Sequence, residues 1–163
     1  MLVRWLIFIH VLSSITFFLA HGTSAAMAFQ LRKETSVERI RAMLDLSGTT
    51  AILLFVSFLI MGITGLIMLF LIKIWNQGWV WLSIVLMVYV FFHMALRNDK
   101  TYYLLRKLVG LPYRQRNKEF PAEPPASEDE ILAHIRKISV YELLFVGFII
   151  PAFVLWLMVF KPF

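Results

Sequence analysis

The chain has 163 residues, of which 60% are hydrophobic and 16% are charged, and it contains no cysteine. Charged residues alone make up about a quarter of a soluble domain, so this composition excludes a soluble globular protein and indicates an integral membrane protein. The lack of cysteine excludes disulfides, thiolate-bound metals and iron–sulfur clusters. The net charge of +6 fits basic loops beside a membrane, so we expect no nucleic-acid partner.

Four apolar segments are long enough to cross a bilayer, which takes roughly 20 helical residues. They cover about residues 2–29, 50–74, 79–96 and 140–160. The first segment, with Arg4 before it and small residues at 24–28, also imitates a signal peptide. Its length and the basic residues that follow it favour a transmembrane helix. We therefore predict one all-α domain over residues 1–163, a polytopic membrane protein with four transmembrane helices in a bundle.

Two longer connections, residues 30–49 and 97–139, join these segments on one side. Thr35 and Glu38 have the spacing of a capping box, which predicts that helix 2 begins before its span. Helical periodicity continues after the third span until Gly110 and Pro112, a typical helix stop. Helices 2 to 4 are therefore expected to extend beyond the membrane on this side.

The region 111–126 is rich in proline and is expected to be a linker. Ser127 and Glu130 form a second capping box, which predicts an amphipathic start to helix 4. Pro151 lies inside the last span and is expected to kink it, because proline lacks the backbone N–H that the helix needs.

Thirteen of the 16 Lys and Arg residues fall in or beside the two longer connections. Cytoplasmic loops carry such an excess, so these connections are predicted to be cytoplasmic and both termini to lie outside. The basic run at residues 106–118 is expected to meet anionic lipid headgroups.

Three histidines lie within the predicted spans: His10, His21 and His93. His10 and His21 are eleven residues apart, which returns a helix to almost the same direction, so both lie on one stripe. Inward imidazoles in a helix bundle are typical axial ligands of haem b. The same side chains could instead hold a metal ion, relay protons or tie helices together.

The depths of the three histidines in the membrane do not decide which two of them would bind one haem. Counted from the outer ends of the spans, the depths are about 12 Å for His10, 21 Å for His93 and 28 Å for His21. Two axial ligands of one iron need similar depths, so helix tilt would have to bring either pair together.

Two further ionisable residues are of interest, and no catalytic motif is present. Glu142 lies near the inner end of the last span, where we expect a base such as Arg97 or Arg136 to pair with it, with proton transfer as the alternative. His134 is expected at the surface. Because no phosphate loop, nucleophile elbow or carboxylate pair occurs, the sequence favours a protein without catalytic residues.

The segments FIHVLSSITFFLAHGTSAAMAFQLR, GWVWLSIVLMVYVFFHM and VFKPF resemble a superfamily of small bacterial membrane proteins. It includes uncharacterised families, to which AHGTSAAMAF and VGLPY are most similar, and more distantly the copper-resistance D proteins and the J-type protoporphyrinogen oxidase. The resemblance implies haem b at the position of His10 and matches His93 and Lys161–Phe163 to oxidase residues. The oxidase's functional lysine has no counterpart near Ser83, so oxidation of protoporphyrinogen is not implied.

The sequence thus leaves three hypotheses for a protein of the bacterial inner membrane. The first is a haem-b-binding or redox-associated protein, such as a subunit of a respiratory or electron-transfer assembly. The second is a cofactor-free structural or accessory subunit. The third is a metal or small-solute permease, which would require a homo-oligomer because four helices form a poor pathway.

Overall fold

The computed structural model describes residues 1–97, 101–115 and 118–163. Four helices in it are long and apolar enough to cross a membrane. The first three are α1 (Leu2–Lys33), α2 (Val37–Leu71) and α3 (Gly78–Arg97). The fourth spans Val140–Phe160 and consists of α6 (Val140–Leu144), the π-helical turn η2 (Phe145–Ile149) and α7 (Ile150–Phe160). The prediction of four helices that are long and apolar enough to span a membrane is confirmed.

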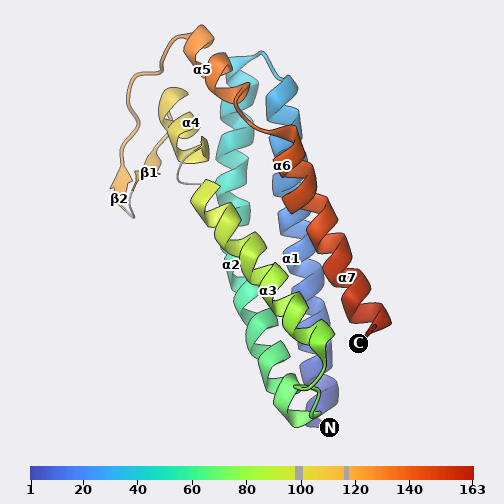
Figure 1. The fold of residues 1–163 in the computed structure, drawn as a ribbon. Coiled ribbons are helices and arrows are strands. Elements are labelled where there is room, and N and C mark those ends of the chain that lie inside the picture. The colour runs from blue at the N-terminus through green and yellow to red at the C-terminus, as the bar shows by residue number, and fades with distance from the viewer. Residues whose placement is uncertain (98–100, 116–117) are drawn as a thin grey trace.

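The long helices run side by side, and both termini lie toward the same end of the molecule (Figure 1). The opposite end carries α4 (Tyr103–Leu108), β1 (Tyr113–Gln115), β2 (Lys118–Phe120) and α5 (Glu128–Ile135). We call these four elements the cap. Within the described residues, α1 and α2 pack together along their length, and α3 packs against α7.

The prediction of an all-α chain is wrong in one place, because the expected linker 111–126 contains a small antiparallel sheet. Tyr113 pairs with Phe120 in its register, and their rings stack at 5.2 Å. The Tyr113 hydroxyl donates a 2.6 Å hydrogen bond to Glu123, and Lys107 lies 3.4 Å from the same carboxylate. These contacts hold the pKa of Glu123 below its ordinary value.

The helices begin and end at the expected capping and stop residues, except that α2 begins one residue later than predicted. Ser36, and not Thr35, is the N-cap of α2, and it accepts a hydrogen bond from the Arg39 N–H. Ser127 caps α5 as expected. The expected continuation of the third helix crosses residues 98–100, which lie outside the described residues. Beyond them α4 ends before Gly110, whose φ of +74° suits glycine at a helix stop.

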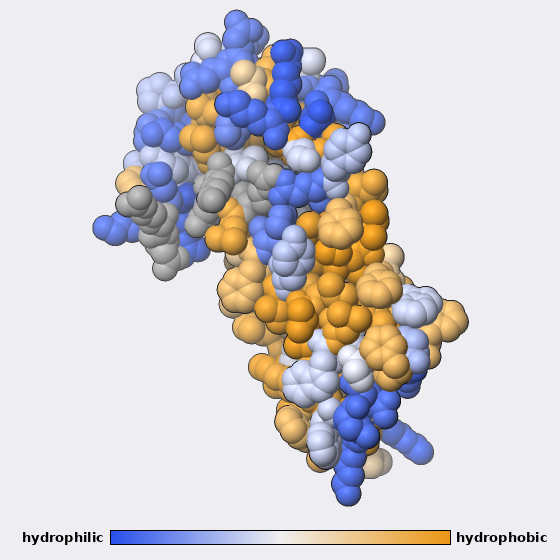
Figure 2. Space-filling model, in the orientation of Figure 1, coloured by the Kyte–Doolittle hydropathy of each residue, from blue (hydrophilic) through white to orange (hydrophobic). Residues whose placement is uncertain are grey.

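The distribution of hydrophobic side chains on the surface shows whether the fold suits water or lipid. Hydrophobic side chains form a band across the middle of the molecule, with hydrophilic ones at both ends (Figure 2). Apolar side chains of the long helices, such as Leu19, Ile52 and Val85, are exposed by 61–73%. Apolar exposure of this kind is stable when lipid, and not water, surrounds the helices.

Buried apolar side chains form three clusters along the long axis. The middle cluster contains Phe17, Met61 and Val90, and the cluster at the far end contains Leu69 and Leu157. The cap has its own cluster, in which side chains of α1, α2, α4 and α5 meet: Leu31, Ile40, Leu44, Leu105, Val109, Leu111, Ile131 and Ile135. The cap is therefore packed onto the helices and is not a loose connection.

We expect Leu105→Ala to destabilise the cap by about 2–5 kcal/mol, because Leu105 is fully buried and its loss leaves a cavity. Leu104→Ala is the matched control, since Leu104 is 42% exposed. The measurement is the rate of limited proteolysis within residues 101–138 in detergent. Equal cleavage rates for the two variants would contradict the packing of the cap.

Candidate functional site

A cavity of about 880 Å³ lies where the cap half of the long helices meets the cap. Its walls come from α1, α2, α3, α4, the two strands and the α6–η2 segment. Ala25, Leu54, Phe55 and Phe91 give it an apolar lining. Its volume lies in the range of ligand pockets, which is roughly 300–1,000 Å³. His21, His93 and Glu142 line it as well, so two of the three predicted histidines share one cavity.

His21 is held on α1 with one ring nitrogen engaged and the other without a partner. Its Nδ1 lies 2.8 Å from the Met94 sulfur of α3, and its ring stacks on Phe17. The residue is only 3% exposed. Its Nε2 is buried and has no hydrogen-bond partner among the described residues. A buried polar atom of this kind is costly and calls for an explanation.

The distorted turn η2 lies beside this imidazole, at the backbone of Val146 and Gly147. Pro151 follows four residues after Gly147 and five after Val146. Because proline has no N–H, it cannot donate to either carbonyl in an α- or a π-helical pattern. The kink expected at Pro151 therefore takes the form of a π-helical turn, with carbonyls that face His21.

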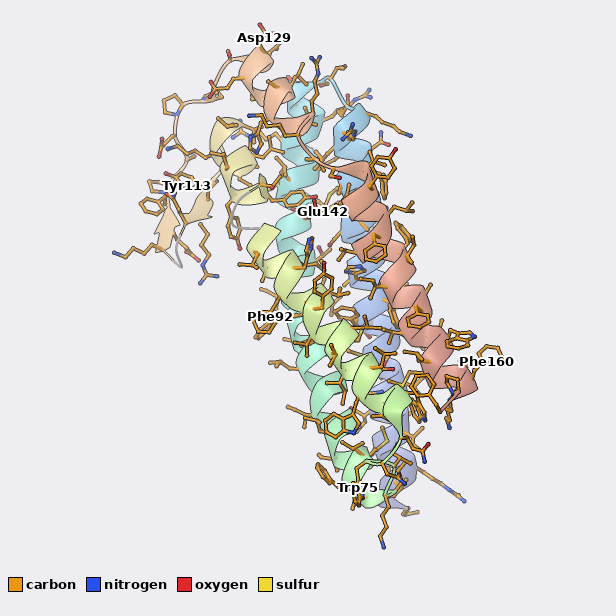
Figure 3. The ribbon with its side chains drawn as sticks, viewed as in Figure 1. Trp75, Phe92, Tyr113, Asp129, Glu142 and Phe160 are labelled. Carbon is orange, nitrogen blue, oxygen red and sulfur yellow. The ribbon has the colours of Figure 1, made fainter. Side chains whose placement is uncertain are left out.

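His93 and Glu142 form an ion pair across the space between α3 and α6, with 2.8 Å between Nε2 and Oε1. Both side chains are about one-quarter exposed. Figure 3 shows Glu142 on the side of α6 that faces the neighbouring helices. The expected partners of Glu142 were Arg97 or Arg136. The structure pairs Glu142 with His93, a partner that this expectation did not include. The side chain of Arg97 lies outside the described part of the chain, so the pairing of Glu142 with a base stays a prediction.

His10 lies outside the cavity and ties α1 to α2. Its Nδ1 is 2.9 Å from the Met61 carbonyl oxygen and 3.2 Å from the Thr64 hydroxyl. Its ring lies over Gly65, where an added Cβ would come within 3.0 Å of the His10 Cε1. This glycine lets the imidazole reach the backbone of α2. The structure thus brings His21 and His93 to one cavity and leaves His10 apart.

Sequence reasoning did not find the contact of Met94 with His21 or the contact of His93 with Glu142. Met94 directly follows His93, yet its sulfur contacts His21 on another helix. No spacing along the chain reveals either contact, because both depend on how α1, α3 and α6 are rotated. His134, expected at the surface, is half-buried in α5, and its Nε2 has no described partner. It does not line the cavity.

The other residues of the resemblance lie away from the cavity. Ser83 is fully buried on α3 and donates to the Trp79 carbonyl. The segment Lys161–Phe163 folds against the start of α3, where the Trp79 N–H donates to the Phe163 oxygen. Among the described residues, no three His, Asp or Glu side chains converge on a metal site.

No protein-family model matches the chain, and no curated protein or solved structure is significantly similar to it. The resemblance to the copper-resistance D and J-type oxidase families therefore stays a prediction. Functional assignment depends on the geometry of the cavity.

We expect Gly65→Ala to weaken the pairing of α1 with α2 by about 1–3 kcal/mol, the usual cost of overpacking, because the new methyl group would push against His10. Gly62→Ala is the control, since its Cβ would meet no atom within 4 Å. It should leave stability unchanged or raise it by up to about 1 kcal/mol through helix propensity. Denaturant unfolding in detergent measures both. A harmless Gly65→Ala would contradict the close seating of His10.

Proposed function

We propose that the protein is an integral membrane protein that binds haem b in this cavity, with His21 as an axial ligand. The observation that carries the proposal is the buried His21 Nε2 beside an apolar cavity of about 880 Å³. Within the described residues it makes no hydrogen bond of normal geometry, although the backbone of Val146 and Gly147 lies near the imidazole. Haem iron accepts this kind of lone pair, and the apolar walls suit its macrocycle.

Met94, which contacts the Nδ1 of His21, favours the tautomer that haem binding requires. A thioether sulfur has no proton to donate, so a hydrogen bond between His21 and Met94 places the proton on Nδ1. Nε2 then carries a lone pair. Metal-binding histidines usually have their second nitrogen held by an outer partner in this way. Phe17 stacks on the ring and limits its rotation.

The same geometry argues against His93 as the second ligand. Its Nε2 is occupied by Glu142 at 2.8 Å. His10 is bound to α2 outside the cavity. The proposal therefore rests on His21 alone among the three histidines.

Bound haem would supply one-electron transfer, and the surrounding residues would keep the site dry and fix the imidazole. A small protein with such a group and no catalytic motif suits a subunit of an electron-transfer assembly, paired with another membrane protein or with a second copy. The basic cap would face the cytoplasm of a bacterial inner membrane, with both termini outside.

The second candidate is a cofactor-free scaffold, which the contacts of His10 favour. For His21 this candidate requires the other tautomer, with Nε2–H directed to the carbonyls of Val146 and Gly147. His21 would then compensate for the donor that Pro151 lacks. The two candidates thus predict different positions for one proton.

Purified protein supplied with haem should show a Soret band that shifts on dithionite reduction. His21→Ala should abolish the band, because it removes the only proposed ligand. His10→Ala is the control and should retain the band while lowering thermal stability. A colourless wild-type protein, or a His21→Ala variant with an unchanged spectrum, would exclude haem at this position.

A further inference from the structure

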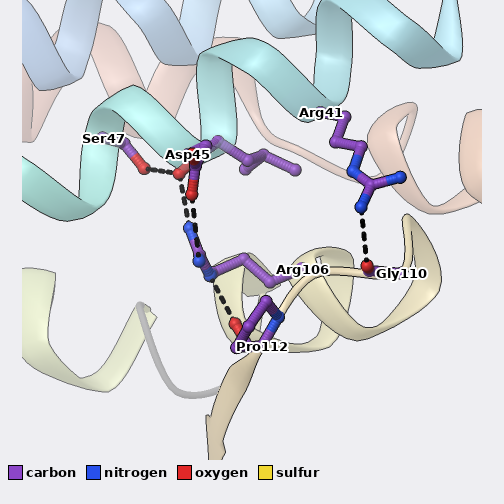
Figure 4. A network of polar contacts seen from close by, with 7 residues as sticks. Arg41, Asp45, Ser47, Arg106, Gly110 and Pro112 are labelled. Carbon is purple, nitrogen blue, oxygen red and sulfur yellow. Dashed lines mark hydrogen bonds and ion pairs between the residues drawn. The ribbon is translucent and has the colours of Figure 1, made fainter. Parts of the chain in front are cut away.

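The basic residues at the cap end of the molecule differ in how far acidic neighbours balance their charge. In the basic run 106–118, Arg106 lies 3.6 Å from Asp45 and also donates to two backbone carbonyls (Figure 4). Lys107 lies 3.4 Å from Glu123. These two positive charges are therefore used to hold the cap together.

A second group of basic residues lies where α1 ends and the fourth long helix begins. Arg32 and Lys33 belong to the last turn of α1, and Arg136 and Lys137 lie just before α6. Arg32 donates a hydrogen bond to the Ile138 carbonyl, so the two basic pairs lie near each other. The ends of α1 and α6 also lie side by side (Figure 1). Within the described residues, none of these four basic side chains forms an ion pair.

A hollow of about 490 Å³ lies at this junction, and its walls are Arg32, Ser139, Val140 and Tyr141. A guanidinium group has five N–H donors, so Arg32 keeps donors for an anion besides the one that bonds to the backbone. The Ser139 oxygen accepts a hydrogen bond from the Glu142 N–H, which leaves the hydroxyl proton of Ser139 to be donated. Tyr141 is 86% exposed and adds a third donor. Donors of this kind fit the oxygen atoms of a phosphate group.

The hollow lies at the level where the apolar helices end. The fourth long helix begins at Val140. Toward the middle of this helix, the rings of Phe29 on α1 and Phe148 on η2 lie 6.0 Å apart, and Phe145 is 52% exposed. These rings offer an apolar surface to acyl chains. A molecule bound here would therefore meet phosphate-binding groups at one end and hydrocarbon contacts at the other.

We propose that this hollow binds the headgroup of an anionic phospholipid, with Arg32 on the phosphate and the acyl chains along Phe29, Phe145 and Phe148. A phospholipid fits better than a free phosphate ion, because the aromatic rings follow the hollow along the same helices. A headgroup with a net negative charge fits better than a zwitterionic one, because the four basic residues beside it have no described acidic partner. Arg32 and Tyr141 do not line the cavity proposed for haem, so the inference does not depend on haem binding.

Native mass spectrometry of the full chain in a non-ionic detergent, titrated with one lipid at a time, tests the proposal. We expect the first phosphatidylglycerol molecule to bind roughly tenfold more tightly than phosphatidylcholine, because several basic side chains attract its net charge. Arg32→Gln should weaken phosphatidylglycerol binding roughly tenfold, since it removes a charge-assisted hydrogen bond. Lys118→Gln is the matched control. It removes the same charge from the exposed strand β2 and should change the affinity by less than about twofold.

Tyr141→Glu places a negative charge at the edge of the hollow and should remove the preference for phosphatidylglycerol. Because Tyr141 is 86% exposed, this variant remains informative if Arg32→Gln folds poorly. Equal affinity of the unmodified protein for the two lipids would overturn the inference. So would Arg32→Gln and Tyr141→Glu variants that lose no more affinity than Lys118→Gln.

Excess soluble glycerol 3-phosphate distinguishes a lipid from a free phosphate as the ligand. It should leave phosphatidylglycerol bound, because it lacks the acyl chains that contact the aromatic rings. Displacement of the lipid by this reagent would overturn the assignment to a lipid. None of these results bears on the Soret band, so the haem proposal stands or falls separately.

Discussion

Every polar group within the four long helices has to be satisfied without water, and this constraint governs the whole structure. The hydroxyl groups meet it locally, since Thr16, Ser24 and Ser83 each donate to the carbonyl four residues earlier in their own helix. Histidine and glutamate side chains reach further and need partners on other helices. The places where such partners are present, or lacking, therefore identify the parts of the interior with a role beyond packing.

Among the described residues, the three histidines of the long helices illustrate this, and their contacts differ in kind. His10 is satisfied by the backbone and hydroxyl group of α2, so its contacts hold helices together. His93 and Glu142 contact each other between α3 and α6. His21 is satisfied on one nitrogen only. These contacts suit helix pairing at His10 and at His93, and a ligand at His21.

The turn before Pro151 links the scaffold to the cavity. Gly147 lies close to α1, where an added Cβ would approach the Ala25 Cβ to 3.2 Å. Small residues at this contact let η2 and α1 pack closely, which brings the carbonyls beside His21. A helix distortion at a functional cavity is a common arrangement. Here the turn brings carbonyl groups to one side of the His21 imidazole, and the Met94 sulfur of α3 lies at its Nδ1. The tautomer of His21 therefore decides between ligand binding and scaffolding.

The sequence by itself determined the four apolar helices, their approximate ends, the Ser127 cap and the stop at Gly110. These features depend on residues that are close together in the chain, so composition and spacing reveal them. The tertiary structure decided the two strands of the cap, the contact of Glu142 with His93 and the separation of His10 from the other two histidines. Each depends on the rotation and tilt of helices about one another, because a stripe on one helix does not specify which neighbour it meets. Contacts between residues far apart in the chain, such as His21 with Met94 and His93 with Glu142, therefore placed His21 and His93 at one cavity.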